Sequence, residues 1–420
     1  MPKFLRAALL LAGLAFAARP ALAADVVLDQ ATLAGAGGAK IVFKNIALKD
    51  TNLTTAEATS LFTGALSRED AGAMLARLSA SEIRIPEADI EVGNGDRFTV
   101  KDIVAEKVAQ GATQKLSFAG VDGVLPDDSG DSTLHLGPLQ VERLSTPGVA
   151  AALAAGDPGV AAFRFSRLTW EGGDLSVVDK KTPSGAPGGN RILLHAGQAT
   201  IDQTFGANGA PLDGTAAFTG LSLKMPPKSQ GGATLAAFGY PELNGAFQIA
   251  GAYDPAAKIY RLKNYALDIQ KIGRVALSAQ ISDVAPTAFV GEKAARQKAL
   301  LDSTLDYAQI EVTNAGLFEK VVAFLSLSQG KTPDAVKAEW RAIVAQAPLL
   351  FSGASAITAV AKEVERFIAD PKTLTLRIKG RDAPLKLGDF QNVADPAALL
   401  DKLQVTGSPA RAGTESGTKL

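Results

Sequence analysis

Hydrophobic and polar residues alternate along most of the chain between residues 25 and 286, in stretches bounded by Gly, Pro, Asn and Asp. A period of two puts apolar side chains on one face of a β-strand and polar side chains on the other. The clearest case is the stretch 260–286, where Leu267 and Ile269 alternate with polar neighbours and the alternation resumes after Gly273. The pattern predicts a β-hairpin with one apolar and one polar face.

The same alternation predicts a series of further strands. They are expected at 40–50, 83–92, 98–108, 134–144, 163–170, 192–202, 216–225 and 245–254. Strands of this kind suit antiparallel sheets with one solvated face. Small residues are frequent on the apolar faces, so we expect one or more long, curved, antiparallel amphipathic sheets whose apolar surface is not densely filled.

After residue 286 the period changes and three amphipathic helices are predicted. Asn314 is expected to cap the first, which ends at Gly330, and Thr332 with Pro333 opens the second. The remaining elements are the third helix at 355–369, strands at 305–312, 373–380 and 403–407, and short helices at 289–301 and from 396 onward. The fold class expected is therefore β-rich α+β.

Composition and pattern divide the chain into five parts. These are a signal peptide at 1–23, an N-terminal β-rich region with a short helix at 24–160, an antiparallel β region at 161–290, a C-terminal α+β unit at 291–409 and a disordered tail at 410–420. Helices are predicted at 67–78 and 146–159, and turn-rich loops at 180–190 and 226–232.

The first residues have the features of a secretory signal peptide. Lys3 and Arg6 precede an uncharged Leu/Ala-rich stretch, and residues 21–23 read Ala-Leu-Ala. A small-residue site of this kind predicts cleavage after Ala23, and the alternative is an uncleaved N-terminal anchor. We expect a periplasmic protein, with full secretion as the second possibility.

The stretch 342–361 carries no charge and has to be considered as a membrane span. Pro348 lies near its middle, and a proline inside a helix costs about 3 kcal/mol. Several polar residues lower its hydrophobicity further. We therefore expect two helices that meet at a buried turn, and no transmembrane segment after signal cleavage.

Charge and composition argue against several kinds of chemistry. Without residues 1–23 the chain is slightly acidic, so no nucleic-acid partner is expected. The chain has no cysteine, and its two histidines, His135 and His195, lie in predicted strands without a nucleophile motif beside them. Asp127 begins a stretch that lacks the glycine and glutamate of a calcium loop. We expect a protein that is not an enzyme and has no cofactor and no metal site.

Two segments 100 positions apart share a pattern of Phe-x-Gly followed by aliphatic residues and a proline. They are 117–126, with Phe118 and Pro126, and 217–226, with Phe218 and Pro226. One interpretation is a repeated strand unit that ends at the margin of a sheet, where proline blocks further pairing. The other is chance similarity between strands in a chain rich in Ala and Gly.

The C-terminal part, from Tyr253-Asp254-Pro255 through LDYAQIEVTNAGLFEKVVAF to FIADPKTLTLRIKG, is similar to uncharacterised periplasmic proteins of alphaproteobacteria over about residues 239–409. The run of long amphipathic strands also loosely resembles the AsmA-like envelope proteins. That resemblance implies a curved sheet with a hydrophobic groove and a role in lipid handling or outer-membrane assembly. The chain is much shorter than the bridging members of that class.

These observations favour a non-enzymatic periplasmic protein that binds a lipid or apolar ligand on a curved sheet. The expected lining residues are Phe218, Leu221, Leu223, Phe247, Ile249, Leu267, Ile269, Val275 and Leu277. For each of them the alternative is burial in a packed core. A structural or interaction scaffold of the cell envelope, with an envelope protein as partner, is the second hypothesis. A cell-wall glycan hydrolase is the third, and it would need two carboxylates about 5–10 Å apart in a cleft.

Overall fold

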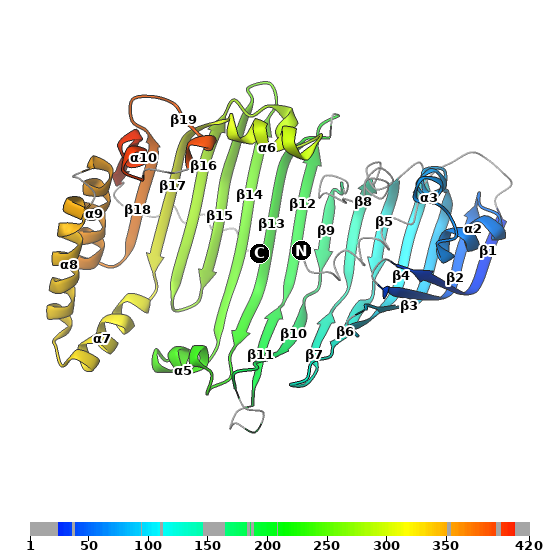
Figure 1. Cartoon of the computed structure of the whole chain (residues 1–420), viewed down its shortest axis with the longest axis horizontal. Coiled ribbons are helices and arrows are strands. Elements are labelled where there is room, and N and C mark those ends of the chain that lie inside the picture. The colour runs from blue at the N-terminus through cyan, green and yellow to red at the C-terminus, as the bar shows by residue number, and fades with distance from the viewer. Residues whose placement is uncertain are drawn as a thin grey trace, which may run out of the picture. The chain divides into compact units, whose positions relative to one another are not determined.

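The computed structural model describes residues 24–35, 38–93, 95–109, 112–145, 164–182, 185, 189–207, 209–350, 354–391 and 396–407. The expected signal peptide at 1–23, the helix at 146–159 and the tail at 410–420 lie outside these residues. The chain forms two compact units (Figure 1). The first contains residues up to Thr204 and Phe218–Thr234, and the second contains Phe205–Ala217 and everything from Leu235 onward.

The first unit is an antiparallel sheet with two described helices on one face. Its strands are β1 (Ala24–Ala34), β2 (Lys40–Thr51), β3 (Ala80–Glu91), β4 (Arg97–Ala109), β5 (Ala112–Phe118), β6 (Gly120–Leu125), β7 (Ser132–Leu136), β8 (Leu139–Ser145), β9 (Arg167–Trp170), β10 (Gly173–Val178), β11 (Arg191–Ala196), nearly all of β12 (Gln198–Phe205) and the second half of β13 (Pro211–Lys224). Helices α2 (Thr55–Thr63) and α3 (Arg68–Leu75) follow β2. The predicted hairpin of β3 and β4 is present.

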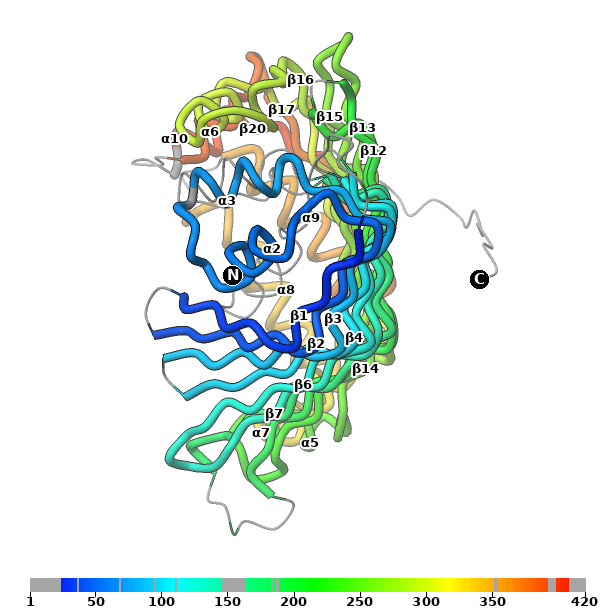
Figure 2. Tube along the Cα trace, turned by 90° about the vertical axis from the view of Figure 1, so that its right-hand side faces the viewer, coloured from blue at the N-terminus to red at the C-terminus, as the bar shows by residue number. Residues whose placement is uncertain are grey.

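A line of glycines interrupts the long strands of this unit. Gly137 separates β7 from β8 and donates its N–H to the carbonyl of Gly172, 2.7 Å away, which lies between β9 and β10. Gly197 separates β11 from β12 and bonds the Thr219 carbonyl at 3.0 Å, next to Gly220 with its φ of +61°. The single strands predicted at 134–144 and 192–202 are therefore each two strands. The backbones approach closely at the breaks, because a Cβ at Gly137 or Gly197 would lie only 3.1 or 3.3 Å from a backbone atom of Gly172 or Gly220. Figure 2 shows strands of this unit turning sharply between their two halves.

The two Phe-x-Gly segments occupy comparable places along this line. Gly120 begins β6 two residues after Phe118 ends β5, and Gly220, with a φ of +61°, lies within β13 two residues after Phe218. Pro126 directly follows β6, and Pro226 comes two residues after the end of β13. In both segments the proline lies beyond the strand, whereas the glycine marks a strand break only in the first and lies inside β13 in the second.

The core of the first unit lies between its apolar sheet face and helices α2 and α3. Phe43 of β2 and Phe62 of α2 are both buried, with ring centroids 5.5 Å apart in an edge-to-face arrangement. The largest buried side chains around them are Ile46, Leu48, Leu75, Leu78, Val100 and Val108. Burial of the apolar side chains decreases along the sheet away from these helices. Leu168 and Leu175, for example, are only partly buried.

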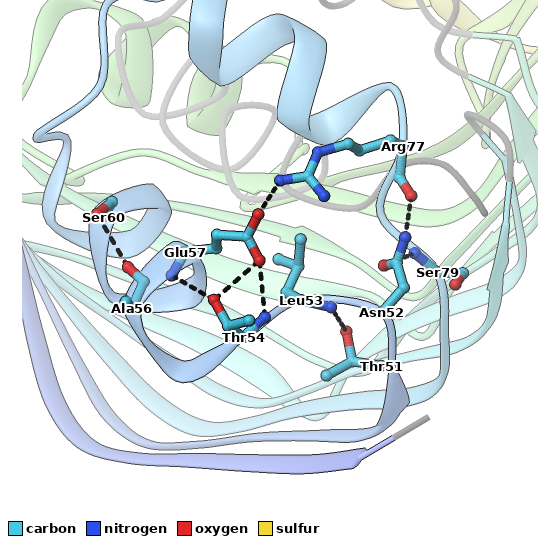
Figure 3. A network of polar contacts seen from close by, with 9 residues as sticks. All are labelled: Thr51, Asn52, Leu53, Thr54, Ala56, Glu57, Ser60, Arg77 and Ser79. Atoms are coloured by element: carbon cyan, nitrogen blue, oxygen red, sulfur yellow. Dashed lines mark hydrogen bonds and ion pairs between the residues drawn. The ribbon is translucent and has the colours of Figure 1, made fainter. Parts of the chain in front are cut away.

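A polar network fastens the two helices to the sheet (Figure 3). Glu57 closes a capping box with Thr54, accepting the Thr54 N–H at 2.8 Å, and its other carboxylate oxygen pairs with Arg77. Asn52 accepts the Ser79 N–H at 2.7 Å and donates to the Arg77 carbonyl at 2.5 Å. The bonds that Glu57 accepts hold its pKa at about 2, first through the Thr54 N–H and then through Arg77.

The second unit is an antiparallel sheet with a helical layer. Its strands are the first half of β13, β14 (Leu243–Asp254), β15 (Ile259–Ile269), β16 (Gly273–Ser282), β17 (Thr304–Asn314), β18 (Thr373–Gly380), β19 (Leu385–Lys386) and β20 (Leu403–Gly407). Its helices are α6 (Lys293–Leu301), α7 (Leu317–Gln329), α8 (Pro333–Leu350), α9 (Ser355–Ala369), α10 (Pro396–Lys402) and the short turns η3 (Pro286–Ala288) and η4 (Leu387–Phe390). Helix α5 (Gln230–Ala237) spans the boundary between the units.

The helix ends follow their capping residues. Asn314 accepts the backbone N–H groups of Gly316 and Phe318 at 3.2 and 3.0 Å, which places it at the start of α7 as predicted. Gly330 ends α7 with a φ of +64°, a conformation that favours glycine. Thr332 accepts the Ala335 N–H at 3.2 Å at the start of α8.

Two small cores hold the second unit together. One joins Ala279 and Leu305 of the sheet to Ala356 of α9, with Leu385 and Val405. The other surrounds Tyr253, Val284 and Ala288, and the Tyr253 hydroxyl donates to the Val284 carbonyl at 2.8 Å. Helix α9 lies against β18 and β20, and α7 and α8 continue the helical layer.

The prediction of a β-rich α+β fold is confirmed. The bounds of α9, β18 and β20 match the predicted 355–369, 373–380 and 403–407. Helix α2 was not predicted, although Thr54 and Glu57 supply a capping-box signal, and α5 begins inside the predicted loop 226–232. Within the described residues, no helix is long and apolar enough to cross a membrane.

Candidate functional site

Six of the nine predicted lining residues come together on one face of the second unit. Phe247 of β14 lies opposite Leu267 of β15, which lies opposite Val275 of β16. Ile249, Tyr265 and Leu277 form the next row in the same register. Directly opposite residues in antiparallel strands project to the same face. Ile269, two residues beyond Leu267, also lies on this face.

The apolar rows continue across the neighbouring strands. Val275 lies opposite Val312 of β17, and Leu277 lies opposite Ile310. Further along the same rows, Val312 faces Leu374 and Ile310 faces Leu376 of β18. The other face of β14–β18 is polar, with Gln248, Asp268, Arg274, Glu311, Thr375 and Arg377 at alternate positions. The sheet is therefore amphipathic over its whole width in this unit.

Only one half of the apolar face is covered. At the end near α6, Tyr253, Ala279, Leu305 and Val405 are buried in the two small cores. In the other half, Tyr265 is 45%, Leu267 41% and Val275 49% exposed. Figure 1 shows α6 in front of the upper ends of β14–β16, whereas no helix lies in front of their lower halves.

We call this uncovered half the open apolar face. Its residues are Phe247, Ile249, Tyr265, Leu267, Ile269, Val275, Leu277, Ile310, Val312 and Leu374, and none of them is buried. The rings of Phe247 and Tyr265 contact each other edge-on, with centroids 5.1 Å apart. Tyr265, Leu267 and Val275 are exposed and the others are partly buried. Neighbouring apolar side chains that stay exposed are a feature of interaction sites.

The other three predicted residues lie elsewhere, on the part of β13 that belongs to the first unit. Leu223 lies opposite Leu194 of β11, which is 39% exposed, and both continue a row that runs through Leu175 and Leu134. Phe218 and Leu221 lie on either side of Gly220, and both are partly buried. They belong to the less covered end of the apolar face of that unit.

Four members of the open apolar face were not predicted: Tyr265, Ile310, Val312 and Leu374. The sequence does contain their signal, because the stretches around residues 305–312 and 373–380 alternate in the same way as β15 and β16. Alternation does not reveal which strands are neighbours or in which register, so their inclusion depended on the tertiary structure.

The opposite end of the open apolar face is bordered by aromatic and basic side chains. The Tyr240 ring lies under the ammonium group of Lys320, 3.7 Å from its centroid, and the Tyr240 hydroxyl donates to the Lys271 carbonyl at 2.8 Å. Lys271 lies in the turn between β15 and β16. Phe238 and Phe324 pack beside them with ring centroids 5.3 Å apart.

Both histidines take part in a ladder on the polar face of the first unit. Asp122, His135, Asp174 and His195 lie opposite one another in turn on β6, β7, β10 and β11. His135 Nδ1 is 2.7 Å from Asp122, and His195 Nδ1 is 2.8 Å from Asp174. Lys101, first, and His135, second, lower the pKa of Asp122.

The partners of both histidines in the described residues are carboxylates of neighbouring strands. No described hydroxyl or amine is bonded to either histidine as a nucleophile, and all four side chains are well exposed. No group of three or more His, Asp or Glu in the described part of the chain is placed to hold a metal ion. The two His–Asp pairs resemble the other ion pairs on the polar face of this sheet, such as Lys49 with Glu82.

A protein family described as an uncharacterised protein matches residues 266–409. The matched stretch begins within β15 and includes β16–β20 and α6–α10, so it lies wholly in the second unit. No curated protein matches the chain.

Proposed function

We propose that this protein is a non-enzymatic, exported protein of the cell envelope that holds the acyl chain of a lipid against the open apolar face. The observation that carries the proposal is the contrast within one sheet face. Tyr253 and Ala279 are buried under the chain's own side chains, whereas Leu267 and Val275 are not. Because these two side chains are about half exposed, covering each of them would recover about 1 kcal/mol, which a ligand can supply.

The chemistry of this face favours an acyl chain over an extended peptide. Strands β15, β16 and β17 each have strand partners on both edges, so their backbone groups are already paired. The hydroxyl of Tyr265 is the one side-chain polar group among the residues of the open apolar face. A peptide strand laid on this surface would lose the hydration of its own N–H and C=O groups without replacement, and an acyl chain carries no such groups.

The cellular setting in this proposal comes from the sequence. Residues 1–23 have the pattern of a signal peptide cleaved after Ala23, which supports a periplasmic location. The resemblance of the strand pattern to AsmA-like envelope proteins supports a role in lipid handling or envelope assembly. An apolar molecule in an aqueous compartment needs a protein surface that shields it.

Purification without detergent, followed by organic extraction and mass spectrometry, tests this proposal. We expect an acyl lipid in near-stoichiometric amount, and we expect the emptied protein to bind a fluorescent fatty acid. Protein that is lipid-free as isolated and also fails to take up the fluorescent probe would rule the proposal out.

A second candidate, an interaction scaffold of the envelope, is favoured by exposed apolar residues on the helical layer. Leu327 of α7 is 85% exposed, and Ile343 and Leu349 of α8 are 61% and 81% exposed. Cross-linking in cells separates the two proposals. A stable protein partner cross-linked through α8, in a preparation without lipid, would favour the scaffold.

A further inference from the structure

We infer that the lipid held on the open apolar face has an anionic headgroup, which lies at Lys320 and Lys271 beside the turn between β15 and β16. This inference rests on the proposed function and specifies the class of lipid. Its basis is the position of two lysine residues, neither of which forms an ion pair within the described residues, at one end of an otherwise apolar surface.

The position of Lys320 follows from the direction of α7. Phe318, two residues earlier, packs edge-on against Trp340 of α8 and Phe367 of α9, each with centroids 5.6 Å apart. Residues two apart on a helix point to nearly opposite sides. Lys320 therefore points away from α9, and its ammonium group lies over the ring of Tyr240.

Tyr240 connects this ammonium group to the β15–β16 turn. Its ring is buried, its centroid is 3.7 Å from the Lys320 Nζ, and its hydroxyl is bonded to the Lys271 carbonyl at 2.8 Å. The turn is also fixed to the start of α7, because the Ala315 N–H donates to the Ile272 carbonyl at 3.0 Å. Tyr240 thus joins the ammonium group of Lys320 to the backbone of Lys271, whose exposed side chain leaves the turn two residues after Ile269 of the open apolar face.

Neither lysine forms an ion pair with a carboxylate in the described part of the chain. The acid next to Lys320, Glu319, accepts a hydrogen bond from the Asn314 side chain at 2.8 Å instead. Asp268 is on the polar face, opposite Arg274. A carboxylate or phosphate at the end of an acyl chain is complementary to this arrangement, because the chain meets the apolar rows while its charge meets the ammonium groups.

The test compares the binding of oleate with that of oleyl alcohol, which has the same hydrocarbon tail and a neutral headgroup. The protein used is the full-length exported protein after bound lipid has been removed. We expect oleate to bind about tenfold more tightly, a difference of about 1.4 kcal/mol, and to lose this advantage at high salt. Two variants remove the charges one at a time, Lys320→Gln and Lys271→Asn. Asn is chosen at position 271 because it tolerates the positive φ of this turn. Each variant should weaken oleate binding about threefold to fivefold and leave oleyl alcohol binding unchanged.

Two controls separate charge from structure. Lys320→Arg keeps the positive charge over Tyr240 and should keep the oleate preference. Lys379→Gln removes a lysine from the polar face of β18 and should change neither affinity. Equal binding of oleate and oleyl alcohol would overturn the headgroup inference and leave the proposed function intact. Binding of neither ligand would overturn both.

Discussion

Leu267 and Val275 lie directly opposite each other on β15 and β16, and both side chains are more than two-fifths exposed. Only a few residues along the same strands, Leu262 and Ala279 form another opposite pair, and these belong to a packed core. One strand pair thus passes from a covered to an uncovered apolar surface. This transition defines the place where a ligand is proposed to bind.

Polar substitution on the open apolar face should remove ligand binding without unfolding the protein. Replacing both Leu267 and Val275 by Asn is expected to weaken fatty-acid binding by roughly tenfold or more, because each side chain loses apolar contact with the ligand. The free energy of unfolding should change by less than about 1 kcal/mol, because both side chains are already exposed. Val27→Asn, at a 65% exposed strand position of the first unit, is the matched control. Unchanged binding in the double variant would place the ligand elsewhere.

The capping network around Glu57 should make the first unit sensitive to acid. The folded pKa of Glu57, about 2, is below the ordinary value of 4.5. The unfolded chain therefore binds the proton more readily, and the stabilisation is complete above the ordinary pKa and is lost as the pH falls toward the folded pKa. Urea unfolding of the wild type and of Glu57→Gln should differ by about 1–2 kcal/mol at neutral pH, and the difference should shrink as the pH falls from 4.5 toward 2. A difference independent of pH would mean that the carboxylate charge is not what stabilises this helix.

The glycine line should not tolerate a side chain at Gly172. Its φ is +88°, and a Cβ would lie 2.2 Å from the Ala196 carbonyl oxygen and 2.3 Å from that of Gly197. Gly172→Ala is expected to destabilise the first unit by more than about 2 kcal/mol, because backbone atoms of the next strand would have to move. Gly189→Ala is the control, since its φ is also positive but no atom lies within 4 Å. It should cost only about 1 kcal/mol. Equal effects, measured by chemical denaturation, would show that the close approach is unimportant.

The buried hydroxyl of Tyr253 should contribute to the stability of the second unit. It donates to the Val284 carbonyl at 2.8 Å, and Tyr253→Phe keeps the ring contact with Phe289 while removing this bond. We expect a loss of about 1 kcal/mol. Burial raises the pKa of Tyr253 above 10.0, so this stabilisation is present below pH 10 and falls as the pH rises further. Parallel alkaline denaturation curves for the two proteins would contradict this expectation.

Much of the secondary structure followed from local pattern. The alternation around Leu267 predicted the β15–β16 hairpin, and Asn314 and Gly330 marked the ends of α7, because these signals act over a few residues. The breaks at Gly137 and Gly197 were missed, since an apolar alternation continues through them. They arise where the backbone of one strand approaches the next, which is a property of strand pairing.

The sequence by itself determined which residues of each strand share a face and where most helices begin and end, because periodicity and capping depend on near neighbours in the chain. Only the tertiary structure decided which half of the apolar face is covered. Leu277 and Ala279 are two residues apart on the same face, yet only Ala279 is in a core, because Ala356 of α9 packs there together with Leu385 and Val405 of the strands β19 and β20. Coverage of this kind depends on contacts between residues far apart in the chain. The alternation of apolar and polar residues in a single strand does not predict those contacts.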